Sequence, residues 1–177
     1  MTLLNYGLIF LLTLSGFSKN IEIKKAGIEK TSKYSSQIPL IDDVWLKNKI
    51  KNRNGKILFI NVWATWCEPC VKEFPDLVKI YNANKDSNFE FLSVSVNLPS
   101  EIDDKVKPFL QKQSANFPVV IISEKRSEQI INLINPDWDG TIPATAIFDK
   151  NGNRKEFFAQ AETYDVFNKG IEKVRSH

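Results

Sequence analysis

The fold of this chain is decided by the stretch Phe59-Ile60-Asn61-Val62-Trp63-Ala64-Thr65-Trp66-Cys67-Glu68-Pro69-Cys70-Val71-Lys72-Glu73-Phe74-Pro75. Residues 56–62 form a short, largely apolar run rich in β-branched and aromatic side chains, which predicts a strand covered on both faces. After the cysteines, apolar residues recur at the i, i+3, i+4, i+7 spacing of an amphipathic helix, namely Phe74, Leu77, Val78 and Tyr81. The two cysteines are therefore predicted to lie where the strand passes into the first turn of that helix.

This position favours a reactive sulfur. The first backbone N–H groups of a helix have no partner within the helix and carry its positive partial charge, so they stabilise an anion such as a thiolate. A free cysteine has a pKa of about 8.5, whereas a cysteine of a Cys-x-x-Cys pair at a helix start titrates at roughly 3.5 to 7.5. We therefore expect Cys67 to be the nucleophile and Cys70 to be its partner.

Composition narrows the possible functions. The chain has 177 residues, a length typical of one domain, and its net charge of +3 is spread without a basic block, which argues against nucleic acid as a partner. Its only two cysteines are too close together to form a structural framework, because a short loop removes little unfolded-state entropy. A zinc site needs about four ligands, and His177 is the one further candidate, so we expect neither a metal nor a cofactor.

The N-terminus has the composition of a targeting segment. Residues 1–18 contain no charged side chain, and the nearly continuous apolar run from Tyr6 to Leu14 is shorter than the ~20 residues of a membrane span. We interpret residues 1–18 as a signal peptide, or alternatively as an uncleaved N-terminal membrane anchor. Residues 19–37 are polar and rich in Lys and Ser, which predicts a linker before a domain at 38–177. Either interpretation places the domain outside the cytoplasm, in the periplasm or secreted.

The rest of the chain predicts alternating strands and helices. A helix is expected to open at Pro39, with Leu40, Ile41, Val44, Trp45 and Ile50 as its apolar stripe. Ser100 is expected to cap a second helix, which Pro108 kinks or splits. Further strands are expected at 89–96, 117–122, 144–148 and 154–160. Further helices are expected at 124–134 and from residue 163 onward, the latter with Val166 on its buried face. Asn151-Gly152 is expected to form a hairpin turn in which both residues have a positive φ angle. This order predicts an α/β fold with a central mixed sheet and helices on both faces.

Three motifs of the chain resemble those of a known protein family. The motifs Asn61 to Cys70, Glu73-Phe74-Pro75 and Thr141-Ile142-Pro143-Ala144-Thr145 are similar to those of thioredoxin-fold proteins, and most of all to the TlpA/ResA-like extracytoplasmic thiol-disulfide oxidoreductases. The resemblance spans residues 38–175. It implies a thioredoxin-like fold in which Pro143 is a cis-proline facing the cysteines, and in which the backbone of Ile142 pairs with the substrate. A trans proline that merely opens a strand is the alternative.

The resemblance also assigns roles around the cysteines. Trp66, Glu68, Pro69, Ile142 and Pro143 are the expected substrate-binding residues. Cytoplasmic thioredoxins carry a buried aspartate where this chain has Asn61, and an amide cannot shuttle a proton. In the TlpA/ResA-like branch a glutamate after the second cysteine takes that role, which here implies Glu73; the alternative is a solvated helix glutamate.

Two further residues lie near the site in the sequence. Glu68 is expected to be exposed and to oppose thiolate formation by repulsion, which favours a reducing couple. Trp138 is expected either to line the substrate groove or to serve packing alone.

The predicted activity is thiol-disulfide exchange, most simply the reduction of disulfides in extracytoplasmic proteins by a monomer. Its partners would be a disulfide-bearing protein substrate and a membrane-bound thiol reductant. A peroxidase is disfavoured. Related peroxidases have the pattern Pro-x-x-x-Thr-x-x-Cys, whereas this chain has Ile60 in place of the proline and Ala64 in place of the threonine. The alternative from another class is a non-catalytic thioredoxin-fold binding module, or one that handles copper through its two cysteines.

Overall fold

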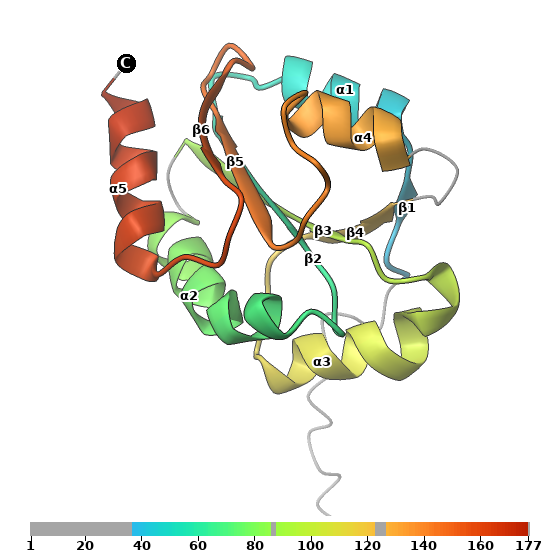
Figure 1. Ribbon diagram of the computed structural model, residues 1–177. Coiled ribbons are helices and arrows are strands. Elements are labelled where there is room, and N and C mark those ends of the chain that lie inside the picture. The colour runs from blue at the N-terminus through green and yellow to red at the C-terminus, as the bar shows by residue number, and fades with distance from the viewer. Residues whose placement is uncertain (1–36, 86–87, 123–126, 177) are drawn as a thin grey trace, which may run out of the picture. The chain divides into compact units, whose positions relative to one another are not determined.

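The computed structural model describes residues 37–85, 88–122 and 127–176, so the predicted signal peptide and nearly all of the predicted linker lie outside the described residues. A six-stranded sheet forms the centre (Figure 1). Its strands are β1 (Leu40–Ile41), β2 (Ile57–Trp63), β3 (Phe89–Ser95), β4 (Val119–Ile122), β5 (Ala144–Phe148) and β6 (Arg154–Phe158). The helices are α1 (Asp43–Lys51), α2 (Glu68–Asn84), α3 (Lys107–Lys112), α4 (Ser127–Ile134) and α5 (Tyr164–Arg175). None of the helices in these ranges has the length and apolarity needed to cross a membrane.

The sheet is mixed, as the sequence predicts. The strand order is β1-β4-β3-β2-β5-β6, in which β1, β4, β3 and β2 run parallel to one another. β5 runs antiparallel to β2, and β6 runs antiparallel to β5. Because β2 lies between β3 and β5, it is covered on both edges as well as on both faces, which agrees with its continuous burial.

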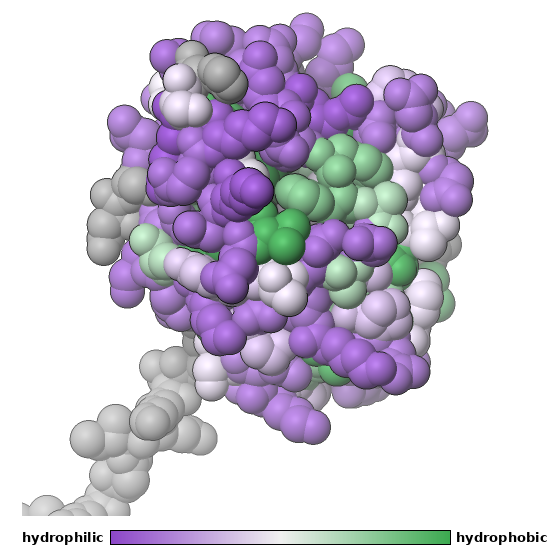
Figure 2. All heavy atoms as spheres, turned by 60° about the vertical axis from the view of Figure 1, so that its left-hand side comes forward, coloured by the Kyte–Doolittle hydropathy of each residue, from purple (hydrophilic) through white to green (hydrophobic). Residues whose placement is uncertain are grey.

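Side chains of β2 alternate between two cores. Phe59 and Trp63 point into the core formed with α2, α3 and α5, whereas Leu58 and Ile60 point into the core formed with α1 and α4. This alternation follows from the two-residue period of a strand. Helices therefore cover both faces of the sheet (Figure 1). The outer surface in the view of Figure 2 is mostly hydrophilic, with hydrophobic side chains gathered in a limited area.

The predicted start of the first helix is wrong. Leu40–Ile41 forms strand β1 and pairs with the end of β4, so the chain is still extended there. The helix begins only after Asp42, whose carboxylate accepts a hydrogen bond from the N–H of Trp45 at 2.8 Å. The apolar stripe is displaced accordingly, because tertiary pairing of the preceding strand shifts the helix toward the C-terminus. The buried residues of α1 are Leu46 and Ile50, whereas Val44 and Trp45 are exposed.

The segment after β3 is split, as Pro108 predicts. It consists of a 3-10 turn at Pro99–Glu101, a π-helical turn at Ile102–Val106 and then α3, with Pro108 in the first turn of α3. The predicted cap at Ser100 is wrong. Glu101 caps the segment instead, because its carboxylate accepts the N–H of Leu98 at 3.0 Å.

Two smaller expectations near the C-terminus also need correction. In the hairpin between β5 and β6, Gly152 has a positive φ of 82°, but Asn151 does not. The carboxylate of Asp149 accepts the N–H groups of Asn151 and Asn153, and this arrangement needs only one left-handed residue. In α5, Val166 is exposed, and the buried face consists of Phe167, Gly170, Ile171 and Val174.

Candidate active site

The two cysteines lie at the junction between β2 and α2. Cys67 is the N-cap residue of α2, with extended backbone angles, and its Sγ accepts the N–H of Cys70 at 3.3 Å. The two sulfurs are joined in a disulfide. Cys67 retains 6% exposure, whereas Cys70 is fully buried. A substrate sulfur therefore reaches Cys67 first, and the helix N-terminus is positioned to stabilise a thiolate there.

A cis peptide bond faces this sulfur. The Ile142–Pro143 bond is cis, as the family resemblance implies, and the Sγ of Cys67 lies 3.6 Å from the carbonyl oxygen of Ile142. β5 begins at the next residue, Ala144, which lies opposite Val62 near the end of β2. Antiparallel pairing of β5 with β2 thus brings together two segments that are more than seventy residues apart in the sequence.

The remaining residues predicted to contact a substrate surround Cys67 at the surface. Trp66 is 64% exposed, and Glu68 and Pro69 are exposed in the first turn of α2. Glu68 forms an ion pair with Lys72 at 2.7 Å, and this hydrogen bond lowers the pKa of its carboxyl group. The expected repulsion between Glu68 and a thiolate is therefore opposed by the neighbouring ammonium group of Lys72.

Glu73 is buried, so the alternative of a solvated helix glutamate is wrong. Its side chain is 3% exposed on the face of α2 that packs against the sheet. The amide of Asn61 donates to its Oε1 at 2.9 Å, and the backbone N–H of Glu162 donates to its Oε2 at 3.1 Å. Burial raises the pKa of Glu73 to about 7, although both hydrogen bonds act in the opposite direction. Near neutral pH this carboxyl group is therefore able both to accept and to release a proton.

Asn61 has a role that sequence reasoning missed. It lies opposite Thr145 in the antiparallel pair, and its Nδ2 donates to the Thr145 Oγ1 at 3.0 Å as well as to Glu73. Among the described residues its Oδ1 has no hydrogen-bond partner. The signal was available in the strand period, because Asn61 shares its face with Phe59 and Trp63 and must point toward α2. Asn61 is thus the residue that holds the buried carboxyl group.

A second polar network positions the loop before the cysteines. Asn97 is buried directly after β3, and its Oδ1 accepts the N–H of Thr65 at 2.9 Å. Its Nδ2 donates to the Thr65 Oγ1 at 2.7 Å and to the Glu101 Oε2 at 2.9 Å. This network connects the loop carrying Trp66 to the end of the neighbouring strand. No sequence pattern indicated it, because it depends on the parallel pairing of β2 and β3.

Trp138 has the expected packing role, and its place in a substrate groove stays a prediction. It is 7% exposed, its ring packs against Phe157, and its Nε1 donates to the carbonyl oxygen of Thr141 at 2.9 Å. It also lines a small cavity together with Trp66 and Ile142. Packing and a place beside the cysteine site are therefore compatible for this side chain.

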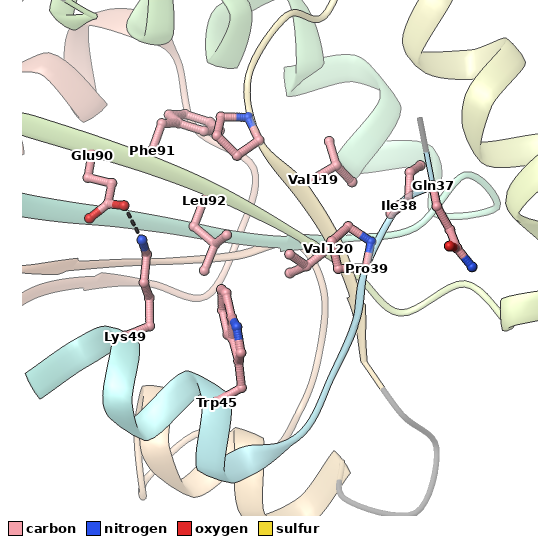
Figure 3. Close-up of a pocket in the computed structure, with 11 residues that line it drawn as sticks. Gln37, Ile38, Pro39, Trp45, Lys49, Glu90, Phe91, Leu92, Val119 and Val120 are labelled. Atoms are coloured by element: carbon pink, nitrogen blue, oxygen red, sulfur yellow. Dashed lines mark hydrogen bonds and ion pairs between the residues drawn. The ribbon is translucent and has the colours of Figure 1, made fainter. Parts of the chain in front are cut away.

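A separate groove of about 380 Å³ lies at the other end of the sheet (Figure 3). Trp45 and Lys49 of α1 point toward the first half of β3 there, and Lys49 is ion-paired with Glu90. Because β2 and β3 are parallel and Cys67 follows the end of β2, this groove is remote from the cysteines. Within the described residues, no three side chains of the metal-ligating types come together.

Comparison with known proteins agrees with this geometry. Residues 38–156 match the model of the AhpC/TSA family. A thiol-disulfide oxidoreductase ResA from Geobacillus kaustophilus is 30% identical over 129 residues, covering 73% of this chain and 69% of the relative. The ResA of Geobacillus thermodenitrificans is 29% identical over the same shares.

Solved structures share the fold. A thioredoxin-family thiol:disulfide interchange protein from Chlorobium tepidum has a TM-score of 0.59 at 24% identity, covering 72% of this chain and 83% of its own. StoA from Bacillus subtilis has a TM-score of 0.52 at 19% identity, covering 66% and 83%. The family match, the ResA relatives and the cysteine pair at the helix start lead to one conclusion: the chain belongs to the AhpC/TSA family of thioredoxin-fold proteins and is a ResA-like thiol-disulfide oxidoreductase.

Proposed function

We propose that this enzyme reduces disulfide bonds of proteins outside the cytoplasm, with Cys67, Cys70 and Glu73 as its catalytic residues. One observation carries the proposal: the sulfur of Cys67, the less buried of the two cysteines, lies at the N-terminus of α2, 3.6 Å from the carbonyl oxygen of Ile142. A helix start favours the thiolate that attacks a disulfide, and the backbone carbonyl oxygen of Ile142 beside it is an acceptor for the N–H of a substrate peptide.

The reaction transfers two electrons from the protein to the substrate. The Cys67 thiolate attacks one sulfur of the substrate disulfide, that bond breaks, and the other substrate sulfur leaves as a thiolate that takes up a proton. Cys70 then attacks the Cys67 sulfur of the mixed disulfide, so that the second substrate sulfur leaves and the Cys67–Cys70 bond forms. Glu73 accepts the proton of the Cys70 thiol in this second step, which its pKa of about 7 suits.

The substrate is a disulfide-bearing protein that docks on Trp66, Glu68, Pro69, Ile142 and Pro143. Trp66, Glu68 and Pro69 flank Cys67 in the sequence and are exposed. The carbonyl oxygen of Ile142 lies 3.6 Å from the Cys67 sulfur, and Pro143, the next residue in the sequence, is buried. A membrane-bound thiol reductant regenerates the dithiol, because compartments outside the cytoplasm lack the cytosolic reductants. The uncharged residues 1–18 support export, either as a signal peptide or as an anchor, and the domain acts as a monomer.

Reduction of insulin by dithiothreitol tests the activity. We expect the wild type to accelerate insulin reduction and Cys67→Ser to abolish the acceleration. Equal rates for the two proteins would favour a non-catalytic binding module. The direction is tested by the reduction potential, which we expect nearer the ~−270 mV of thioredoxin than the ~−120 mV of a strong oxidant.

The natural substrate is sought with Cys70→Ser, which cannot resolve the mixed disulfide and should retain its substrate covalently. Cys67→Ser is the matched control, since it lacks the attacking sulfur. A protein captured equally by both variants would not be held by the proposed mixed disulfide with Cys67.

A further inference from the structure

A small apolar cavity opens beside the exchange site. It measures about 190 Å³ and lies between the end of the central strands, helix α4 and the segment that precedes the cis peptide. Two of its wall residues adjoin the reactive cysteine: Trp66 directly precedes Cys67 in the sequence, and the carbonyl oxygen of Ile142 lies 3.6 Å from the Cys67 sulfur. The opposite wall is formed by Ile131 of α4 and by Trp138.

The cavity shares Trp66 and Ile142 with the surroundings of Cys67 that a substrate must approach. A protein whose sulfur is bonded to Cys67 passes over Ile142 and next to Trp66. A chain extends by at most about 3.3 to 3.6 Å per residue, so the side chains one or two residues from the substrate cysteine are the ones within reach of the cavity. The occupant is therefore a side chain of the substrate protein close to its reactive cysteine.

The lining selects the chemistry of that side chain. Every side chain in the wall is aliphatic or an indole, and the Nε1 of Trp138 is already donating to the carbonyl oxygen of Thr141. A charged or amide side chain would lose its water here without gaining a partner. An apolar cavity of about 150 Å³ is large enough to admit benzene, so this one accommodates a leucine, isoleucine or phenylalanine side chain.

Gly140 keeps this cavity open. Its φ is +89°, and a Cβ at this position would lie 3.0 Å from the Cδ1 of Ile131, across part of the cavity wall. A residue with a side chain would be strained in this backbone conformation and would crowd the space beside α4.

We propose that this cavity is a specificity pocket that takes a large apolar side chain located one or two residues from the substrate cysteine. The proposal rests on the proposed disulfide reductase function and adds its substrate class: cysteines flanked by aliphatic or aromatic residues. Peptides with glycine or aspartate at that place are poorer substrates.

Peptide disulfides test the pocket directly. Each probe is a symmetric disulfide of one short cysteine peptide in an alanine background, with leucine, glycine or aspartate placed at one of the two positions on either side of the cysteine. The pre-reduced protein transfers two electrons to each probe, giving two peptide thiols and the Cys67–Cys70 disulfide. For at least one position we expect the leucine probe to be reduced about tenfold faster than the glycine probe, and the aspartate probe to be reduced no faster than the glycine probe.

Variants of α4 assign the preference to the cavity. Ile131→Trp fills the space, and we expect the leucine-to-glycine rate ratio to fall to about one; Ile131→Phe is the milder replacement if the tryptophan variant does not fold. Gln129→Trp adds the same ring at an exposed position of the same helix and should keep the wild-type ratio.

The outcomes separate the two proposals. If the wild type reduces leucine, glycine and aspartate probes at equal rates, the pocket is refuted and the reductase function stands. If the preference survives in the Ile131 variants, the pocket is likewise refuted. If the wild type reduces neither the probes nor insulin, the reductase function itself fails.

Discussion

Replacing the buried carboxyl group by an amide, Glu73→Gln, should change how the stability of the protein depends on pH. The pKa of Glu73 is raised from 4.5 to about 7, chiefly because burial disfavours the charged form. The difference of about 2.5 pH units corresponds to about 3 kcal/mol at 1.36 kcal/mol per unit. Glu73 is only 3% exposed, so solvent does little to screen this penalty.

The sign follows from proton binding in the two states. Below about pH 4.5 the carboxyl group is protonated in both the folded and the unfolded chain, and it contributes no penalty. As the pH rises from about 4.5 to about 7, the unfolded chain releases the proton first, so the folded state loses stability. Above about pH 7 the full penalty is present. Relative to the wild type, Glu73→Gln should therefore gain about 3 kcal/mol between acidic and mildly alkaline pH.

Urea unfolding of the oxidised proteins, at about pH 4 and about pH 8.5, measures this difference. The Cys67–Cys70 disulfide stays intact, so no thiol titrates in this range. Any pH-independent cost of the glutamine side chain cancels when the two pH values are compared. Glu68→Gln is the matched control on the same helix: the pKa of Glu68 is lowered, so this carboxylate favours the folded state at higher pH, and its removal should give no gain in stability at about pH 8.5 relative to about pH 4. Parallel stability curves for the wild type and Glu73→Gln would refute the reasoning.

Three further predictions concern the surroundings of the site. Asn61→Leu removes the amide that donates to Glu73, so the pKa of Glu73 should rise above about 7 by roughly one unit or more, and a carboxyl NMR titration that shows no rise would contradict this. Phe74→Ala empties a fully buried site in the core between α2 and the sheet and should cost about 3 to 5 kcal/mol in urea unfolding, so a loss below about 1 kcal/mol would contradict the packing. Asp42→Ala removes the cap that accepts the Trp45 N–H; thermal unfolding should show a loss of about 1 kcal/mol with insulin reduction unchanged, whereas unaltered stability would show that the cap is not needed.

Local patterns predicted much of this molecule correctly. The apolar run of β2, the helix period after the cysteines and the Asn151-Gly152 turn each report on backbone geometry within a few residues, and the structure has the corresponding strand, helix and hairpin. The beginning of α1 was mistaken because Leu40–Ile41 becomes a strand only through its pairing with β4, far along the chain. A local pattern carries no information about such a partner.

In the candidate site, too, some features follow from local sequence and others only from the tertiary structure. The sequence by itself determined the Cys67–Cys70 pair at a helix start, the nearby glutamate on the same helix and the family to which the chain belongs, because helix ends and short spacings depend on local geometry. The structure confirmed that the Ile142–Pro143 segment faces the sulfur, which the family resemblance implied. Only the tertiary structure decided that Asn61 holds the buried Glu73 and that an apolar cavity adjoins the site. Those features depend on strand register and on the exclusion of water between packed elements, and both arise only when distant parts of the chain meet.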